Sequence, residues 1–243
     1  FSDDEADEFL AMTYGSRSAL FARYKDPMAA VSKCLRGMII PSPGMVFVVC
    51  DYAQIEARVL AWVAGQADAI DAYRAGVDQY KRMASKVFGV PEAAVTDAQR
   101  FLGKTLILGA GYQLGAGALQ TKLCSVGVDI DEEEAKLYIR AFREQFFMLP
   151  PLWRSLVNAF FQCLDRSEPV TVRGVLHFRS EVRRGRKSIY IDLPSGTTLA
   201  YHGVTSRMVD PPWDGEKIRQ AFAIDPKSTK PYAVGPQTLT ENV

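Results

Sequence analysis

The sequence has 243 residues, of which 48% are hydrophobic and 23% charged, and its formal net charge is +1. These proportions are those of a folded globular chain, and no apolar run approaches the roughly 20 residues of a membrane helix, so no membrane partner is expected. The acidic start lacks an initiator Met, which indicates a piece of a longer chain and not a secretory signal. Four scattered cysteines without a Cys-x-x-Cys pair favour a reducing, cytoplasmic setting.

The first third of the chain is expected to contain short helices and then one strand. Residues 9–35 have helical character that is interrupted at Gly15 and at Asp26-Pro27. The unbroken apolar run 45–50 is typical of a strand buried on both faces, and Asp51 follows it directly. The sequence therefore predicts a carboxylate at the end of a buried strand.

A helix is predicted from Gln54 to about Gly65, where apolar residues recur with helical spacing. The apolar positions, expected to face the core, are Ile55, Val59, Trp62 and Val63. Glu56 and Arg58 lie off this stripe.

The next helices are expected at residues 67–75, 79–88, 129–145 and 153–164, with another that begins just after Thr96. Thr96 and Gln99 have the spacing of a capping box. Arg100, Lys104 and Leu108 then follow at intervals of four, so they share one helix face, with Tyr112 one step further. Two cations near a helix N-terminus form a surface that can hold phosphate.

After Pro169 the pattern changes to short strands, at residues 170–172, 175–178, 189–193 and 198–201. Residues 210–236 are rich in Pro and Gly and are expected to form a loop, and residues 238–243 resemble a first helical turn. Six cations lie between residues 173 and 187, among them Arg183 and Arg184. A solvated hairpin tip and a surface that contacts DNA phosphates explain this cluster about equally well.

Asp51, Arg100 and Lys104 together suit phosphoryl transfer, which needs metal ions and cations that hold the phosphates in line. Asp51, with the carbonyl oxygen of Tyr52, is the candidate metal ligand. Residues 51–58 resemble motif A of family A DNA polymerases, the polymerase I type, and residues 100–112 resemble their motif B. Flanking segments extend the resemblance, with phage-type features, to most residues from Leu35 to Val243.

The resemblance implies a role for each matching residue. Asp51 would bind both catalytic Mg²⁺ ions, with Mn²⁺ as a possible substitute, and Tyr52 would join one of them through its carbonyl. Arg100 and Lys104 would contact the incoming triphosphate, and Glu56 would exclude a ribose 2′-hydroxyl. The other expected contacts with nucleotide or DNA are those of Gln54, Arg58, Tyr80, Leu108, Tyr112, Arg183, Arg184 and Asn242.

Several departures from the family pattern bear on function. Leu108 stands where the family usually has Phe or Tyr, and Gln113 replaces a common Gly. The chain ends before motif C, which carries the second metal-binding Asp, so a separate C-terminal segment is an expected partner.

The resemblance implies an α+β fold that is a fragment of a right-hand polymerase. Residues 1–63 would form an incomplete antiparallel palm, 64–168 helical fingers and 169–243 a β-rich extension. Its partners would be primer–template DNA and deoxynucleoside triphosphates, in a bacterial cell or a phage-infected host. Two functions stay open: a template-directed DNA polymerase that another segment completes, and a fragment that binds nucleotide or DNA without catalysis.

Overall fold

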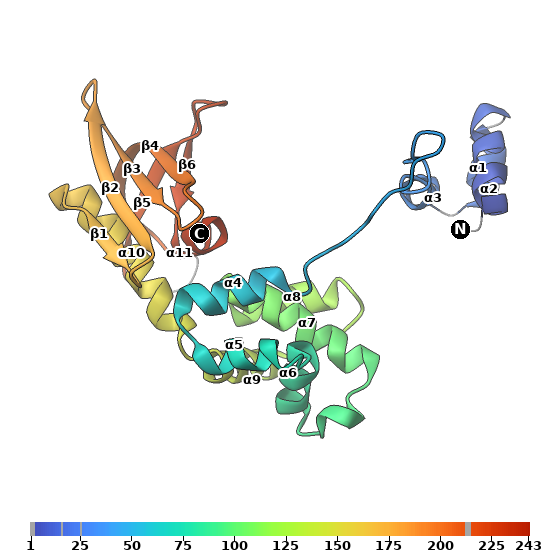
Figure 1. Cartoon of the computed structure of the whole chain (residues 1–243), viewed down its shortest axis with the longest axis horizontal. Helices are drawn as coiled ribbons and strands as arrows, with labels where there is room; N and C mark the ends of the chain where they lie inside the picture. Colours follow the sequence, from blue (N-terminus) through green and yellow to red (C-terminus); the bar gives the residue numbers. More distant parts are fainter. Residues whose placement is uncertain (1–2, 16, 25, 212–214) are drawn as a thin grey trace. The chain divides into compact units, whose positions relative to one another are not determined.

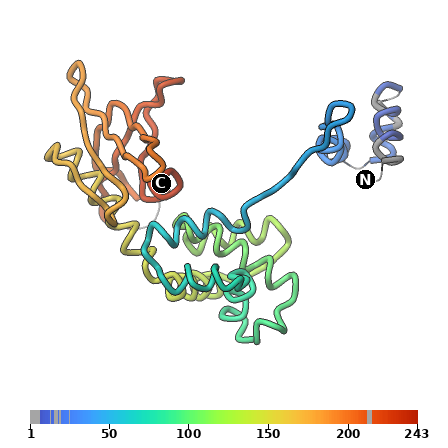
Figure 2. The backbone as a smooth tube through the Cα atoms, in the orientation of Figure 1, coloured from blue at the N-terminus to red at the C-terminus, as the bar shows by residue number. Residues whose placement is uncertain are grey.

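The computed structural model describes residues 3–15, 17–24, 26–211 and 215–243, and Figure 2 traces the chain in order. The chain forms two compact units, Phe1–Tyr52 and Ala53–Val243. In the described ranges no helix is both long and apolar enough to cross a membrane.

The first unit contains three short helices, α1 (Asp3–Gly15), α2 (Arg17–Arg23) and α3 (Pro27–Cys34). Asp26 begins α3, because its carboxylate accepts hydrogen bonds from the backbone N–H groups of Met28 and Ala29. Phe9 is buried in a small core with Ala30 and Cys34. The interruptions expected from the sequence are confirmed.

The apolar run 45–50 differs from the prediction of a buried strand. It forms neither helix nor strand, and the exposed fractions of Met45 to Val49 lie between 54% and 89%. A strand requires a neighbouring strand that pairs with its backbone groups. Within the described residues no strand pairs with this run, so its hydrophobicity does not suffice to make it one.

The second unit begins with a group of helices (Figure 1). They are α4 (Ile55–Ala64), α5 (Ala67–Arg74), α6 (Gln79–Phe88), the short 3-10 helix η1 (Glu92–Ala94), α7 (Asp97–Gly111), α8 (Ala116–Cys124), α9 (Glu132–Gln145) and α10 (Leu149–Arg166). The capping box of Thr96 and Gln99 is present at the start of α7, as predicted. Helix α7 is central, because it contacts α4, α6, α8 and α9.

Close packing fixes α7 against α6. A Cβ atom at Gly103 would overlap the carbonyl oxygen of Tyr80 and lie 3.2 Å from the backbone N of Ala84. Only glycine permits this approach of the two backbones. The second turn of α7 is therefore held against the first two turns of α6.

The buried face of helix α4 differs from the predicted core stripe. Val63 is buried, but Ile55, Val59 and Trp62 are 43%, 41% and 51% exposed. The buried face carries small residues instead, namely Ala57, Ala61 and Ala64. Small side chains let α4 approach its neighbours α5, α7 and α10 closely. Trp153 of α10, by contrast, is buried.

The rest of the unit is one antiparallel sheet with strands in chain order. The strands are β1 (Val170–Val172), β2 (Leu176–Arg183), β3 (Arg186–Asp192), β4 (Thr198–Val209), β5 (Ile218–Ile224) and β6 (Pro231–Val234), followed by helix α11 (Pro236–Asn242). The prediction of one long loop at residues 210–236 is wrong, because this range contains strands β5 and β6. The segment Ile218–Ile224 contains neither Pro nor Gly, and its Ala221 and Ala223 are buried.

Helix α10 joins the helices to the sheet, since it contacts α4 as well as β1, β2 and β3 (Figure 1). Arg219 of β5 binds Asp165 of α10 through two hydrogen bonds of 2.7 and 2.6 Å. One continuous hydrophobic core runs through helices and sheet. The fold is α+β with an antiparallel sheet, as predicted.

Candidate functional site

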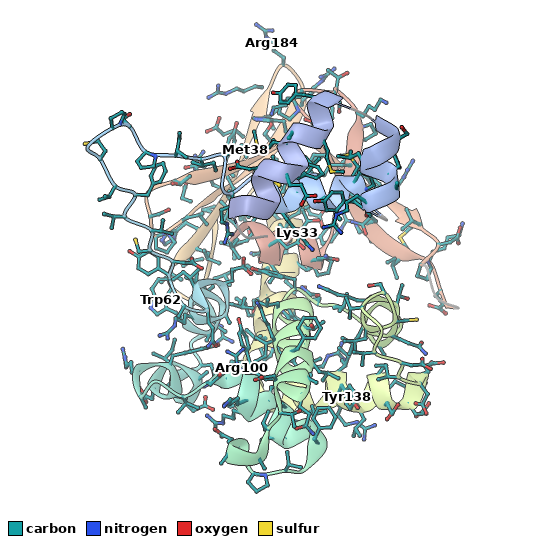
Figure 3. All side chains as sticks on the ribbon, turned by 90° about the vertical axis from the view of Figure 1, so that its right-hand side faces the viewer. Lys33, Met38, Trp62, Arg100, Tyr138 and Arg184 are labelled. Atoms are coloured by element: carbon teal, nitrogen blue, oxygen red, sulfur yellow. The ribbon has the colours of Figure 1, made fainter. Side chains whose placement is uncertain are left out.

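The N-terminal half of α7 carries the two cations that the sequence singled out. Arg100, Lys104 and Leu108 lie one helical turn apart on one face of α7. Lys104 is exposed and forms no ion pair with any described residue. Arg100, labelled in Figure 3, is only partly exposed. The expected cationic face is therefore present, but its two members differ in their surroundings.

Arg100 is bound to the start of α6. Its Nε donates a 2.7 Å hydrogen bond to Asp78 Oδ2, and its guanidinium lies over the Tyr80 ring, 5.3 Å from the ring centre. Asp78 also caps α6 by accepting from the backbone N–H groups of Tyr80 and Lys81. Burial raises the pKa of Asp78, but the hydrogen bonds from Arg100 and from the helix start outweigh it and hold this pKa below its usual value.

Tyr112, the residue after α7, reaches the first turn of α4. Its hydroxyl donates a 3.2 Å hydrogen bond to Glu56 Oε2. Burial, the charge of Glu56 and this hydrogen bond raise the pKa of Tyr112 to about 12. The same carboxylate contributes to a raised pKa of Tyr80, where burial is the largest cause. Glu56, Asp78, Tyr80, Arg100 and Tyr112 thus form one group, which we call the α7 cluster.

Asp78 is a member of this cluster that the sequence did not identify as functional. The sequence did contain a signal for its structural role, because an Asp directly before a helical segment is a common N-cap. Its contact with Arg100, 22 residues away, depends on the packing of α6 against α7.

The candidate metal ligands lie in the first unit. Asp51 and Tyr52 are exposed, and neither lies in a helix or strand. Among the described residues no three His, Cys, Asp or Glu side chains gather where they could hold a metal ion.

Gln54 has strained geometry at the start of α4, with φ 56° and ψ 35°. This left-handed conformation costs about 1–3 kcal/mol for a residue other than glycine. Its buried Oε1 accepts no hydrogen bond from the described residues. Strain and an unpaired polar atom often accompany a functional position.

Two other predicted DNA contacts take part in internal contacts. Arg58 Nε donates to the carbonyl oxygen of Ala53 at 2.8 Å, and its guanidinium lies over Tyr73, 4.8 Å from the ring centre. Asn242 donates through Nδ2 to the hydroxyl of Tyr201 at 2.9 Å. Arg58 therefore fixes the segment before α4, and Asn242 fixes α11 against the sheet.

The basic cluster lies around the β2–β3 hairpin, and Figure 3 shows Arg184 pointing outward at its tip. Arg184 and Gly185 both have positive φ, 52° and 73°, as a two-residue hairpin turn requires. Arg183 lies 3.0 Å from Glu181, whereas Arg184 has no ion pair with a described residue. The hairpin tip is confirmed, and contact with phosphates stays a prediction.

Comparison with known proteins identifies the family. The sequence model of DNA polymerase family A matches residues 27–163. The DNA polymerase of Bacillus phage SP02 is 30% identical over 189 residues, which cover 77% of this chain and 28% of that protein. The thermostable DNA polymerase I of Thermus aquaticus is 35% identical over 112 residues, 46% of this chain and 13% of that protein.

A solved structure is also similar, the POL domain of Pol1 from M. smegmatis in complex with DNA primer–template and dNTP. It is 29% identical, with a TM-score of 0.41 over 54% of this chain and 20% of that one. The chain spans less than a third of the length of the curated relatives described above. Because the family model covers more than half of the sequence, this chain belongs to DNA polymerase family A.

Proposed function

We propose that this chain forms the nucleotide-binding part of a template-directed DNA polymerase, which transfers a nucleotidyl group from a deoxynucleoside triphosphate to a primer 3′-hydroxyl. The observation that carries the proposal is the face of α7 that bears Arg100 and Lys104. At the C-terminal end of the same helix, the Tyr112 hydroxyl donates a hydrogen bond to Glu56. Cations on one helix face can hold a triphosphate, and the residues at the base of that face can select its sugar and base.

The residues of the α7 cluster, together with Lys104 and Leu108 on the same helix, have distinct roles in this proposal. Lys104 and Arg100 bind the triphosphate, and Arg100 exchanges the Asp78 carboxylate for a phosphate oxygen. Tyr80 supports the Arg100 guanidinium through its ring. Glu56 lies at the sugar and excludes a 2′-hydroxyl by its bulk, Leu108 packs beside the sugar, and Tyr112 lies beside the templating base.

The DNA contacts form a second set in the proposal. Gln54 would face the minor groove of the nascent pair, where an accepting or donating amide can meet base edges. Arg183 and Arg184 would contact backbone phosphates, and Asn242 would contact the duplex beside α11. Arg58 would act indirectly, by fixing the chain that leads into α4.

Two-metal chemistry requires more carboxylates than the described residues bring together. Asp51 offers one carboxylate and Tyr52 one carbonyl oxygen, which does not amount to a metal site. We therefore place the second carboxylate on a separate C-terminal polymerase segment. Mg²⁺ is the expected ion.

Primer extension tests the proposal. The chain would be assayed alone and joined to the segment that follows the matched region in the phage SP02 relative. We expect extension only from the joined protein, and its loss in Asp51→Ala. Unchanged extension by Asp51→Ala would show that the metal ligand is misassigned. A joined protein that binds triphosphate and DNA without extension would favour the alternative, a binding fragment without catalysis.

Nucleotide binding tests the α7 face without any need for catalysis. Replacement of Lys104 or Arg100 by Ala removes a charge-assisted contact worth about 1.5–3 kcal/mol, so the affinity for dATP is expected to fall by about tenfold or more. Lys122→Ala is the control, since Lys122 is also exposed but lies on α8. Equal losses in all three variants would contradict a specific site on α7.

A further inference from the structure

A buried tyrosine of helix α5 carries a polar atom for which the contacts described above give no role. Tyr73 is 3% exposed, and its hydroxyl forms no hydrogen bond with any residue that the structure describes. A buried hydroxyl without a partner destabilises a folded protein, because it has lost its hydrogen bonds to water and has gained none in return. Such a group in a native structure indicates a partner that another state of the protein supplies.

The ring of Tyr73 is held in place by Arg58 of α4. The Arg58 guanidinium lies over this ring, 4.8 Å from its centre, and Nη1 of Arg58 donates a 3.5 Å hydrogen bond to the carbonyl oxygen of Tyr73. Nε of the same arginine donates to the carbonyl oxygen of Ala53 at 2.8 Å. These contacts fix the ring, so the Tyr73 hydroxyl stays in the protein interior.

Tyr80 of the α7 cluster lies close to Tyr73. Burial is the largest cause of the raised pKa of Tyr73, and the charge of Tyr80 raises this pKa further, whereas the charge of Arg58 lowers it. One phenol affects the pKa of another only over a short distance. Tyr80 is itself only 7% exposed, and its hydroxyl also forms no hydrogen bond with a described residue. Two tyrosine hydroxyls without partners therefore lie in the same region.

The two tyrosines belong to two similar Arg–Tyr pairs. Arg58 covers Tyr73 as Arg100 covers Tyr80, with guanidinium-to-ring distances of 4.8 and 5.3 Å. Arg100 is also bonded to Asp78, whereas Arg58 is bonded to backbone carbonyl oxygens. A phosphate that draws Arg100 away from Asp78 would shift the guanidinium over Tyr80 and leave the Arg58–Tyr73 pair in place.

We propose that Tyr73 is a positioning residue of the triphosphate site, and that its hydroxyl donates a hydrogen bond to the Tyr80 hydroxyl oxygen when a triphosphate is bound. The inference rests on the proposed function, in which Arg100 exchanges the Asp78 carboxylate for a phosphate oxygen. The new hydrogen bond holds the Tyr80 ring beneath the shifted guanidinium. It also satisfies the Tyr73 hydroxyl, so the bound state is favoured over the free state.

The variant Tyr73→Phe tests the inference, because it removes only the hydroxyl. The affinity for dATP should fall by about threefold to tenfold, the effect of one lost hydrogen bond between uncharged groups. The urea midpoint of the free protein should rise, because an unpaired polar atom is removed from the interior. A purely structural role of the hydroxyl would not produce these opposite changes.

Tyr138→Phe is the matched control. Tyr138 of α9 is 7% exposed, and the variant removes the same atom from a buried tyrosine outside the α7 cluster. Its affinity for dATP should equal that of the unmodified protein.

A double-mutant cycle identifies the partner of the Tyr73 hydroxyl. In a protein that already carries Tyr80→Phe, the further change Tyr73→Phe should not weaken dATP binding, because the proposed hydrogen bond is already absent. Losses in affinity that add in the double variant would overturn the pairing of the two hydroxyls.

Three results would overturn the inference and leave the proposed function intact, provided that Lys104→Ala weakens dATP binding. They are an unchanged affinity in Tyr73→Phe, an equal loss in Tyr138→Phe, and a urea midpoint that falls in Tyr73→Phe. Absence of dATP binding by the unmodified protein would contradict the proposed function, and this inference with it.

Discussion

The Tyr112 hydroxyl lies 3.2 Å from Glu56 Oε2, and this hydrogen bond joins the end of α7 to the first turn of α4 across 56 residues of sequence. It connects the two segments that resemble motifs A and B. The side chain proposed to select the sugar and the one proposed to lie beside the templating base thus support each other.

The hydrogen bond predicts a change in the titration of Tyr112. In Glu56→Gln its pKa should fall from about 12, because the carboxylate charge is lost, but should stay above the ordinary value of 10.0, because burial is the largest cause of the shift. NMR of the protein with ¹³C-labelled tyrosine, recorded over a range of pH values, measures the pKa of Tyr112. Glu241→Gln is the control, since the charge of Glu241 makes the smallest contribution to the raised pKa of Tyr112. A Tyr112 pKa that does not respond to Glu56→Gln would mean that the contact is absent in solution.

Glu56→Ala should raise the incorporation of ribonucleotides relative to deoxynucleotides by about tenfold or more, which corresponds to about 1.4 kcal/mol. The reason is the proposed clash of this carboxylate with a 2′-hydroxyl. Single-nucleotide extension by the joined polymerase gives the ratio. Glu241→Ala, which removes a neighbouring carboxylate on α11, should leave it unchanged. Unaltered sugar selection in Glu56→Ala would reject the assignment.

Asp78→Asn should lower the free energy of unfolding by up to about 1 kcal/mol at pH 7, because Asn still caps α6 but loses the charge that faces Arg100. The pKa of Asp78 in the folded protein lies below its ordinary value of 3.8. Its stabilisation is therefore complete above pH 3.8 and is lost as the pH falls through the folded-state value. The difference between the two proteins should shrink in that range.

Urea unfolding at a series of pH values measures this difference. Asp131→Asn is the matched control, because Asp131 caps α9 and has no ion pair with a described residue. A difference for Asp78→Asn that is constant from pH 7 to the acid range would contradict the ion pair.

Gly103→Ala should destabilise the fold by about 1–3 kcal/mol, since its methyl group would overlap the Tyr80 carbonyl and push α6 away from α7. It should also weaken dATP binding, because the clash would shift α7, which carries Arg100 and Lys104, from its position against α6. Gly117→Ala is the control: no atom lies within 4 Å of the added Cβ, and alanine favours the helix by about 0.5–1 kcal/mol. Thermal unfolding of both variants would detect the expected opposite signs. A stable Gly103→Ala protein would show that the helices are not in close contact.

Arg184→Ala should reduce the salt dependence of duplex binding by about 0.9, the contribution of one phosphate contact. Arg183→Ala should have a smaller effect, because Glu181 already neutralises Arg183. Titration of a blunt duplex at several salt concentrations gives both slopes. Identical slopes for Arg184→Ala and the unmodified protein would favour a hairpin tip without a role in binding.

The sequence by itself determined features that depend on neighbouring residues. The capping box at Thr96, the shared face of Arg100 and Lys104, and the strand character after Pro169 follow from local hydrogen bonds and periodicity, and all are present. The motif spacing also identified the family, because it records residue types in order and needs no knowledge of packing.

Only the tertiary structure decided which faces and partners these elements have. The buried face of α4 carries alanines while Trp62 is half exposed, and the run 45–50 forms no strand because no described strand pairs with it. The contacts of Arg100 with Asp78 and of Tyr112 with Glu56 join residues distant in sequence. Such contacts arise from the packing of α7 against α6 and α4, which local sequence preferences do not specify.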